Sequence, residues 1–196
     1  MANVDAPSGF RPAFHLAGGV IRPQKYAIAS GLNNAIGYGD MVIRVNTNKN
    51  VDAMDATSDV PILGSFAGCY YRNSAGEHIF SRNWVAATTT LGSAAAVAYV
   101  YDDPWIVYEV QVATGSTVIA VTEIGQMVDL SYAEPNATTG MSNAEVTYAA
   151  GSEDNFMIYD IVPRDDNEAN AAHTKVWVTI NRHPWLNAGA ANMTEI

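Results

Sequence analysis

The stretch Val97–Val112, VAYVYDDPWIVYEVQV, constrains the fold most strongly because it holds two strand-like runs separated by a breaker. In Trp105–Val112 the even positions are all apolar, whereas the odd positions become polar toward the end of the run. This period of two is typical of a β-strand with one buried face. Asp102–Pro104 ends the run Val97–Tyr101, because proline lacks the ladder N–H and aspartate favours local turns. The stretch therefore predicts a β-hairpin.

Other runs of apolar, β-branched and aromatic residues predict further short strands. They lie at Val20–Ser30, Met41–Val45, Ile62–Arg72, His78–Val85, Thr117–Val121, Gln126–Leu130, Asn143–Ala149, Phe156–Val162 and Lys175–Asn181. Turn-forming residues separate these runs, and Asn46–Asp59 and Ala86–Ala98 are expected to be loops. No segment has the pattern of an amphipathic helix. The sequence therefore predicts an all-β fold, a single β-barrel or β-sandwich of short strands.

The 196 residues suffice for one well-packed domain, and no linker-like segment divides them. We expect residues 1–19 to form an extended N-terminal arm, residues 20–185 a β body and residues 186–196 a C-terminal tail. The arm is expected to be extended because its prolines and glycines interrupt every possible helix. No repeat of fixed period is apparent, which argues against a propeller or a solenoid.

Charge and composition exclude several classes of partner. Asp and Glu number 20 against 10 Lys and Arg, which gives a formal charge of −10 and disfavours nucleic acid and anionic membranes as partners. No stretch approaches the roughly 20 apolar residues of a membrane helix, and the N-terminus lacks a signal-peptide pattern. The single cysteine, Cys69, permits no intrachain disulfide and is expected to be a buried, inert thiol.

We find no motif that carries catalytic or metal chemistry. Gly37-Tyr38-Gly39 lacks the third glycine of a dinucleotide fingerprint, and Gly64–Gly68 does not match a nucleophile elbow. The four histidines and the acidic pairs do not have the spacing of a metal site, although the histidines can still converge in the folded chain. These residues are His15, His78, His173, His183, Asp102-Asp103, Glu153-Asp154 and Asp165-Asp166. We therefore expect that the protein needs no metal and no cofactor.

Aromatic residues leave one binding alternative open. Tyr70, Tyr71, Tyr99, Tyr101, Trp105 and Trp185 could line a carbohydrate platform. Aromatic side chains on strands are first of all core and interface residues. A carbohydrate-binding sandwich or a glycan-active enzyme therefore requires an exposed aromatic platform or two facing carboxylates.

Short motifs spread along the chain point to a known group of proteins. They are Asn3–Pro12 (NVDAPSGFRP) with His15 and Gly18-Gly19, Lys25–Ala29 (KYAIA), Asp102-Asp103-Pro104 before Tyr108–Gln111, Gly125 through Leu130, Thr139–Ser142 and Val178–His183. Together they resemble small structural proteins of tailed bacteriophages, in which a similar proline- and glycine-containing start leads into a β-rich body.

The resemblance implies a head decoration, or cement, protein. Such a protein is a non-enzymatic virion component that binds the major capsid protein on the outside of the capsid shell, commonly as a homotrimer, and strengthens the shell. The expected location is therefore the capsid surface of the virion, after assembly in the host cytoplasm. Another virion component, such as a tail or head-to-tail joining protein, is the alternative.

Two sets of contact residues follow from this reading. The arm Pro7–Leu16 is expected to attach to the shell, because its apolar residues have too few neighbours in sequence to bury themselves. The contact residues would be Phe10, Arg11, Pro12, Phe14, His15 and Leu16. The competing interpretation is that the arm folds back over an open end of its own barrel and covers an edge strand. Trp177 shares a strand face with polar residues and is expected to contact another subunit, unless that face is buried as well.

Overall fold

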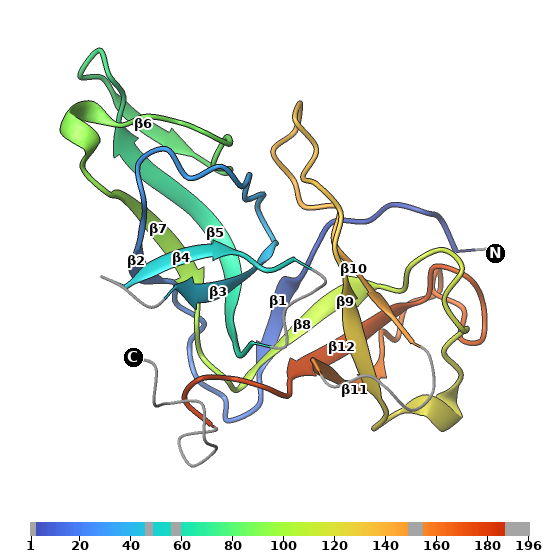
Figure 1. The fold of residues 1–196 in the computed structure, drawn as a ribbon. Coiled ribbons are helices and arrows are strands. Elements are labelled where there is room, and N and C mark those ends of the chain that lie inside the picture. The colour runs from blue at the N-terminus through green and yellow to red at the C-terminus, as the bar shows by residue number, and fades with distance from the viewer. Residues whose placement is uncertain (1–2, 46–48, 56–59, 149–154, 187–196) are drawn as a thin grey trace.

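The structure is a computed structural model that describes residues 3–45, 49–55, 60–148 and 155–186. Figure 1 shows its strands in two groups that lie side by side. The described residues form twelve β-strands, and their only helical elements are two short 3-10 turns, Leu91–Ser93 and Val121–Glu123. The fold is all-β, as predicted. Beyond residue 186, the predicted C-terminal tail lies outside the described residues.

The first group is a six-stranded antiparallel sheet. Across the sheet its strands are β1 (Arg11–His15), β8 (Ile106–Gln111), β12 (Lys175–Ile180), β11 (Phe156–Ile161), β9 (Met127–Ser131) and β10 (Glu145–Thr147). A parallel bridge between Val112 and Val146 brings β10 back against the end of β8. The sheet therefore curls around its own core.

The second group closes into a five-stranded barrel. Its strands are β3 (Met41–Val45), β4 (Asn50–Ala53), β2 (Gln24–Ile28), β7 (Ala96–Tyr101) and β5 (Ile62–Arg72), with β6 (His78–Ser81) on the outer side of β5. An additional pairing between β3 and β5 closes the ring. Closure removes the exposed edges that an open sheet of these strands would have.

Two glycines allow β5 to serve both of its barrel neighbours. Gly64 has a φ of 153°, and a Cβ at this position would lie 1.9 Å from the carbonyl oxygen of Tyr101. Gly68 has a φ of 126° and follows a register shift in the pairing with β7. Gly64 therefore marks a close backbone approach and Gly68 a bulge in β5.

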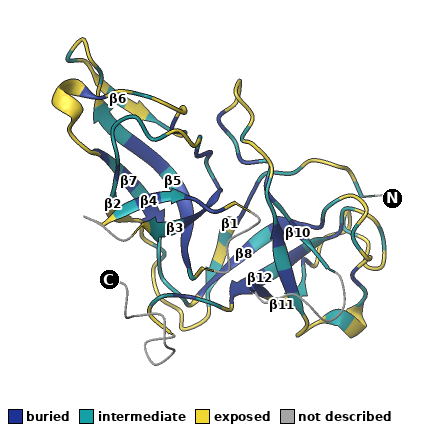
Figure 2. Ribbon diagram, in the orientation of Figure 1, coloured by how far each residue is buried: buried dark blue, intermediate teal, exposed yellow. Residues whose placement is uncertain are grey.

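Each group of strands surrounds a hydrophobic core. The core of the first sheet includes Phe10, Ile106, Tyr108, Val128, Phe156, Val176 and Val178, and that of the barrel includes Ile28, Val42, Leu63, Phe66, Trp84 and Val100. Figure 2 shows buried residues along β5, β8 and β12. Met41 and Ile62, which belong to barrel strands, contribute to the core of the first sheet. The two cores therefore meet where the barrel contacts the sheet.

The predicted hairpin Val97–Val112 is wrong in its pairing, although both runs are strands. β7 lies between β2 and β5 in the barrel, whereas β8 lies between β1 and β12 in the first sheet. β7 and β8 each pair with two strands that are far away in sequence, and not with each other. Asp102–Pro104 therefore carries the chain from the barrel to the first sheet. The predicted burial of the even positions is confirmed at Ile106, Tyr108, Val110 and Val112.

The sequence also fails to predict one strand and predicts another that does not form. β4 lies within Asn46–Asp59, which the sequence predicts to be a loop, and its Val51 and Ala53 are buried in the barrel. Two apolar residues in a polar segment are too weak a signal for a strand. Thr117–Val121 is not a strand; it contains the buried Ile119 and runs into the second 3-10 turn.

The predicted strand Met41–Val45 is buried on both of its faces at its start. Met41 is buried in the core of the first sheet, but Val42 is equally buried in the barrel core, and Val45 is exposed. The strand lies between the two cores at its start, so both of its faces are apolar there. Cys69 is buried in the barrel core as predicted, and burial raises the pKa of its thiol to about 12.

The N-terminal arm folds onto its own body, which corrects the expectation that it needs another protein to bury its apolar residues. β1 pairs antiparallel with β8 and covers that edge of the first sheet. Phe10 is 0% exposed and stacks on Phe156, with ring centroids 4.7 Å apart. The neighbours that bury Phe10 come from a strand far away in sequence, which a local reading of the arm does not contain. The fold-back alternative describes the arm correctly.

Candidate functional site

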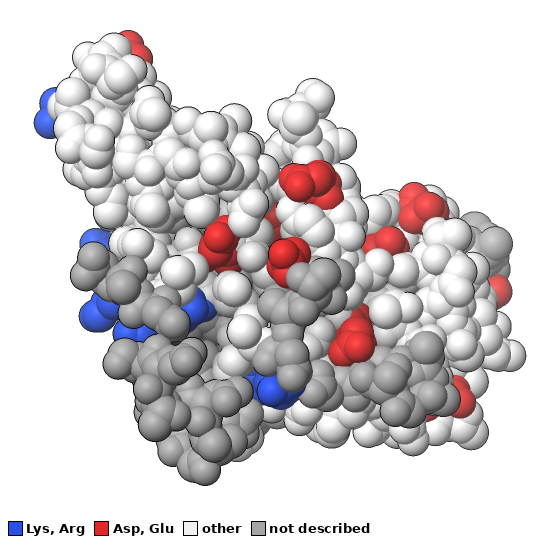
Figure 3. Space-filling model, viewed as in Figure 1, with Lys and Arg blue, Asp and Glu red and all other residues white. Residues whose placement is uncertain are grey.

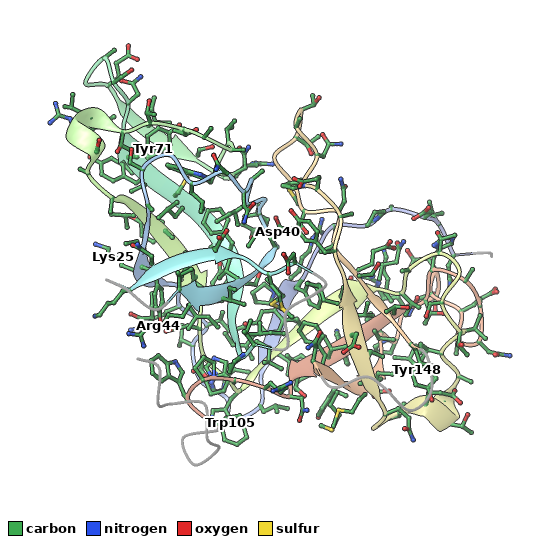
Figure 4. All side chains as sticks on the ribbon, in the orientation of Figure 1. Lys25, Asp40, Arg44, Tyr71, Trp105 and Tyr148 are labelled. Atoms are coloured by element: carbon green, nitrogen blue, oxygen red, sulfur yellow. The ribbon has the colours of Figure 1, made fainter. Side chains whose placement is uncertain are left out.

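A surface pocket of about 520 Å³ lies where the chain crosses from the barrel to the first sheet. Its walls come mainly from three cationic and three aromatic side chains, Lys25, Arg44, Lys49, Tyr26, Trp105 and Trp185. Figure 4 shows Lys25, Arg44 and Trp105 in succession along one side of the molecule. Pairing of β2, β4 and β3 in the barrel brings the cations together, and the crossing segment supplies Trp105.

The pocket is basic although the protein is acidic. Residues 20–104, which include every barrel strand, contain six Lys and Arg and seven Asp and Glu, whereas the rest of the chain contains four and thirteen. Figure 3 shows blue Lys and Arg side chains gathered on the barrel side, and most red acidic side chains elsewhere. Within the described part of the chain, Lys25, Arg44 and Lys49 form no ion pair. These cations are therefore available to an acidic partner.

The two acidic residues at the pocket are engaged by their own chain. The Tyr26 hydroxyl donates to Asp102 Oδ2 at 2.6 Å. Burial, followed by this hydrogen bond, raises the pKa of Tyr26 above its usual range. For Asp103, burial alone would raise the pKa of the carboxyl, but hydrogen bonds from the Trp105 backbone N–H and from His15 outweigh it and lower the pKa. Neither carboxylate is paired with a pocket cation.

His15, predicted to contact the capsid, instead supports the rim of the pocket. Its Nδ1 accepts the backbone N–H groups of Ala17 and Gly19, both at 3.1 Å. The ring proton therefore lies on Nε2, which faces the Asp103 carboxylate at 3.0 Å. Asp103 in turn accepts the Trp105 backbone N–H at 2.9 Å. The arm thus fixes the segment that carries Trp105.

Both tryptophans of the pocket have exposed rings on fixed backbones. Trp105 is 49% and Trp185 50% exposed. His183 is fully buried, and burial lowers its pKa, so its imidazole is neutral. Its Nδ1 accepts the Trp185 backbone N–H at 3.2 Å and its Nε2 donates to the Leu63 carbonyl at 2.9 Å. Large exposed aromatic rings beside cations are typical of protein-binding surfaces.

A second feature is an aromatic cluster on the outer face of the first sheet. Phe14 packs edge-on against Trp177 at 5.0 Å and against Tyr159 at 5.6 Å. Tyr159 is 41% exposed, whereas Trp177 is partly buried. Trp177 therefore lies on the outer face, as predicted, but the arm covers part of it. The Trp177 indole N–H is buried and has no hydrogen-bond partner among the described residues.

The other predicted capsid-contact residues differ in exposure. Arg11 is exposed and lies opposite Glu109 in the pairing of β1 with β8. Leu16 is also exposed, Pro12 is half-buried and Phe10 is fully buried. Of the six predicted contact residues, Arg11 and Leu16 are therefore the two that are exposed.

A third feature brings together side chains that are far apart in sequence. Ligand atoms of Asp5, Glu145 and His173 all lie within 4.8 Å of one another. The buried side chain of Gln111 donates to both carboxylates. Sequence spacing contains no sign of this cluster, because its members come from the N-terminal segment, β10 and the loop before β12.

The described residues contain no helix that is long and apolar enough to cross a membrane. No protein family, curated protein or solved structure was found to match this chain. A function must therefore be argued from the pocket, from the outer face of the first sheet and from the short motifs that resemble phage structural proteins.

Proposed function

We propose that this protein is a virion structural protein that binds the outside of a bacteriophage capsid shell and stabilises it. The observation that supports a binding role most directly is the basic, tryptophan-lined pocket on an otherwise acidic surface. The short motifs that resemble phage decoration proteins suggest the identity of the partner, the major capsid protein.

The chemistry of the pocket favours an acidic segment of that partner. Carboxylates of the segment would pair with Lys25, Arg44 and Lys49, which have no ion-pair partner in the described part of the chain. Apolar side chains of the same segment would cover the exposed rings of Trp105 and Trp185. Charge complementarity supplies orientation and specificity, and buried aromatic rings supply most of the binding energy.

The arm has a supporting role in this proposal. Its buried Phe10 is not a contact residue, and His15 positions the rim of the pocket. Arg11 and Leu16, which remain exposed, are proposed to contact the shell beside the pocket. The arm therefore links binding to the stability of the first sheet.

We also propose that subunits associate through the aromatic cluster of Phe14, Tyr159 and Trp177. Met157 adds exposed apolar surface on β11, the strand that carries Tyr159 of this cluster. A second subunit would cover the accessible part of the Trp177 ring and could offer an acceptor to its indole N–H. A homotrimer is the expected assembly. Sedimentation of the wild-type protein and of Y159A, free and on particles, measures it; a strict monomer in both states contradicts trimer formation.

The binding proposal is tested with capsid particles that lack the protein. Purified wild-type protein and the variant K25E/R44E are added, and occupancy is measured by co-sedimentation. We expect charge reversal to lower the affinity at least about tenfold, because the partner's carboxylates would then meet like charges. W105A should weaken binding by at least about 1 kcal/mol, since it removes an exposed aromatic anchor.

Arg72→Glu is the matched control, because Arg72 is an exposed cation on β5 that does not line the pocket. This variant should bind like the wild type. Equal occupancy of wild type and K25E/R44E would contradict the proposed surface. A cryo-electron map that shows the protein on the tail or at the head-to-tail joint would identify it as a different virion component.

The two exposed tryptophans favour carbohydrate binding as the second candidate function. Trp105 and Trp185 line one pocket and are each about half-exposed, which meets the requirement for an exposed aromatic platform. A titration of tryptophan fluorescence with acidic and neutral oligosaccharides distinguishes the candidates. Saturable quenching that W105A abolishes, together with no binding to particles, would favour the carbohydrate function.

A further inference from the structure

We propose that Asp5, Glu145 and His173 form a binding site for one divalent transition-metal ion. Each residue offers one ligand atom, and these three atoms lie within 4.8 Å of one another. The proposal runs against the expectation from the sequence, where none of the histidines has the spacing of a metal site.

Three segments of the chain hold the ligands in place. Asp5 precedes β1, Glu145 begins β10 and His173 lies in the loop before β12. The Asn3 side chain donates to the Glu168 carbonyl at 2.9 Å and accepts the Glu168 N–H at 2.7 Å, which fastens the N-terminal segment to the loop of His173. His173 itself has a φ of 59°, a left-handed conformation that few residues other than glycine adopt. The ligands are thus positioned by the fold.

The side-chain amide of Gln111 lies at the centre of the cluster, and His173 Nδ1 lies 3.6 Å from Asp5 Oδ1. The Gln111 amide nitrogen lies 2.9 Å from Asp5 Oδ1, 2.8 Å from Glu145 Oε1 and 3.4 Å from His173 Nδ1. An amide has two N–H groups, which serve the two carboxylates, and in the tautomer with its proton on Nε2 His173 Nδ1 is a third acceptor for them. Burial raises the pKa of Glu145, and the nearby Asp5 carboxylate adds to this rise. The hydrogen bond from Gln111 opposes both effects. A cation would satisfy all three acceptors at once.

The donor set selects the class of metal. One imidazole nitrogen and two carboxylate oxygens suit Zn²⁺ and related transition metals, whereas Ca²⁺ and Mg²⁺ prefer oxygen ligands alone. The metal would replace the Gln111 amide nitrogen between the ligands. Rotation of the Gln111 amide would then present its oxygen as a fourth ligand, at the expense of the bond that it accepts from the Ala6 N–H at 3.0 Å.

The test is a titration of the full chain with Zn²⁺, after treatment with a chelator, by calorimetry and native mass spectrometry. We expect one Zn²⁺ per chain and a higher melting temperature with Zn²⁺, because the ion binds only the folded state. His173→Asn removes the imidazole but tolerates the left-handed backbone, and Asp5→Asn removes one carboxylate from a half-exposed position. Each should weaken binding at least about tenfold.

His78→Asn is the matched control, because His78 is an exposed histidine on β6 outside the cluster. It should bind Zn²⁺ like the wild type. Absence of saturable Zn²⁺ binding by the wild type overturns the site, as does binding that survives both H173N and D5N. Should H173N fail to fold, D5N alone decides between these outcomes. Ca²⁺ bound as tightly as Zn²⁺ overturns the assignment to a transition metal.

Discussion

The barrel and the first sheet protect their strand edges in different ways. The barrel closes on itself, because β3 pairs with both β4 and β5. The first sheet instead receives β1 from the N-terminal arm as a cover for β8. The comparison shows that the arm is a structural part of the sheet, whereas the barrel depends on bends within its own strands.

The two regions also differ in charge. The barrel region is almost neutral overall and carries the basic pocket, whereas most of the acidic excess lies in the rest of the chain. An acidic region disfavours association with acidic partners, while the basic pocket attracts them. This difference in charge supports our proposal that an acidic partner binds on the barrel side.

The largest expected loss of stability is at Gly64, where β5 approaches Tyr101 closely in the closed barrel. In Gly64→Ala the new Cβ would overlap the Tyr101 carbonyl oxygen, which lies in backbone that cannot move without breaking the pairing of β5 with β7. We expect a loss of more than about 4 kcal/mol in the free energy of unfolding, measured by urea denaturation. Gly115→Ala is the control: a Cβ there meets nothing within 4 Å, so only the cost of its positive φ, about 1 kcal/mol, should appear. Similar losses in both variants would show that closure of the barrel does not depend on Gly64.

The next effect is at the arm of the first sheet. Phe10→Ala removes a fully buried ring that stacks on Phe156, so we expect a loss of about 3 to 4 kcal/mol in the free energy of unfolding. Phe80→Ala is the control, because Phe80 is 77% exposed on β6 and should cost well under 1 kcal/mol. A Phe10→Ala protein as stable as the wild type would mean that the arm is not part of the core in solution.

The difference between the two regions also explains which features the sequence predicts. Lys175–Ile180 and Ile106–Gln111 alternate with a period of two, and this local signal identifies them as strands. Their partners are not a local property. Asp102–Pro104 has the composition of a turn whether it reverses the chain or carries it to another sheet, so the hairpin prediction failed there.

The sequence predicts even less of the candidate site than of the fold. Trp105 and Trp185 are recognisable as aromatic residues that could line a platform, but the cations of the pocket converge only after the barrel has closed. His15 pairs with Asp103, 88 positions away, and so acts within its own chain where the sequence predicts a contact with a partner. Both the convergence of the cations and the position of His15 depend on contacts between segments that are distant in sequence.

A third effect concerns the buried Asp40, which precedes β3 where the barrel meets the sheet. Burial raises the pKa of its carboxyl to about 6, so ionisation of Asp40 destabilises the folded state as pH rises from about 4 to about 6. Asp40→Asn keeps an acceptor for the Gly37 N–H, which Asp40 Oδ2 binds at 2.6 Å. We expect the variant to be more stable by about 2 kcal/mol at pH 7, and the gain to vanish as pH falls toward 4.

Thermal unfolding from pH 4 to pH 8 measures this effect. Asp166→Asn is the control, because Asp166 is an exposed carboxylate in the loop before β12, and its replacement should change the free energy of unfolding by less than about 1 kcal/mol. A constant difference between Asp40→Asn and the wild type over this range would contradict the raised pKa.

The smallest expected effect on stability concerns two arginines, Arg164 beside the first sheet and Arg44 at the pocket. Arg164, beside the first sheet, donates to Glu109 at 2.8 Å and lies 3.6 Å from Asp166, whereas Arg44 at the pocket forms no ion pair with the described residues. Because Arg164 is well exposed, we expect Arg164→Ala to cost only about 0.5 kcal/mol in low salt, and less in high salt. Arg44→Ala should leave the free energy of unfolding unchanged within about 0.5 kcal/mol but weaken binding to particles. Urea denaturation at two salt concentrations measures the first difference and co-sedimentation the second. If Arg44→Ala lost stability and kept its affinity, the pocket cations would serve the fold, and the division of roles between barrel and sheet would be wrong.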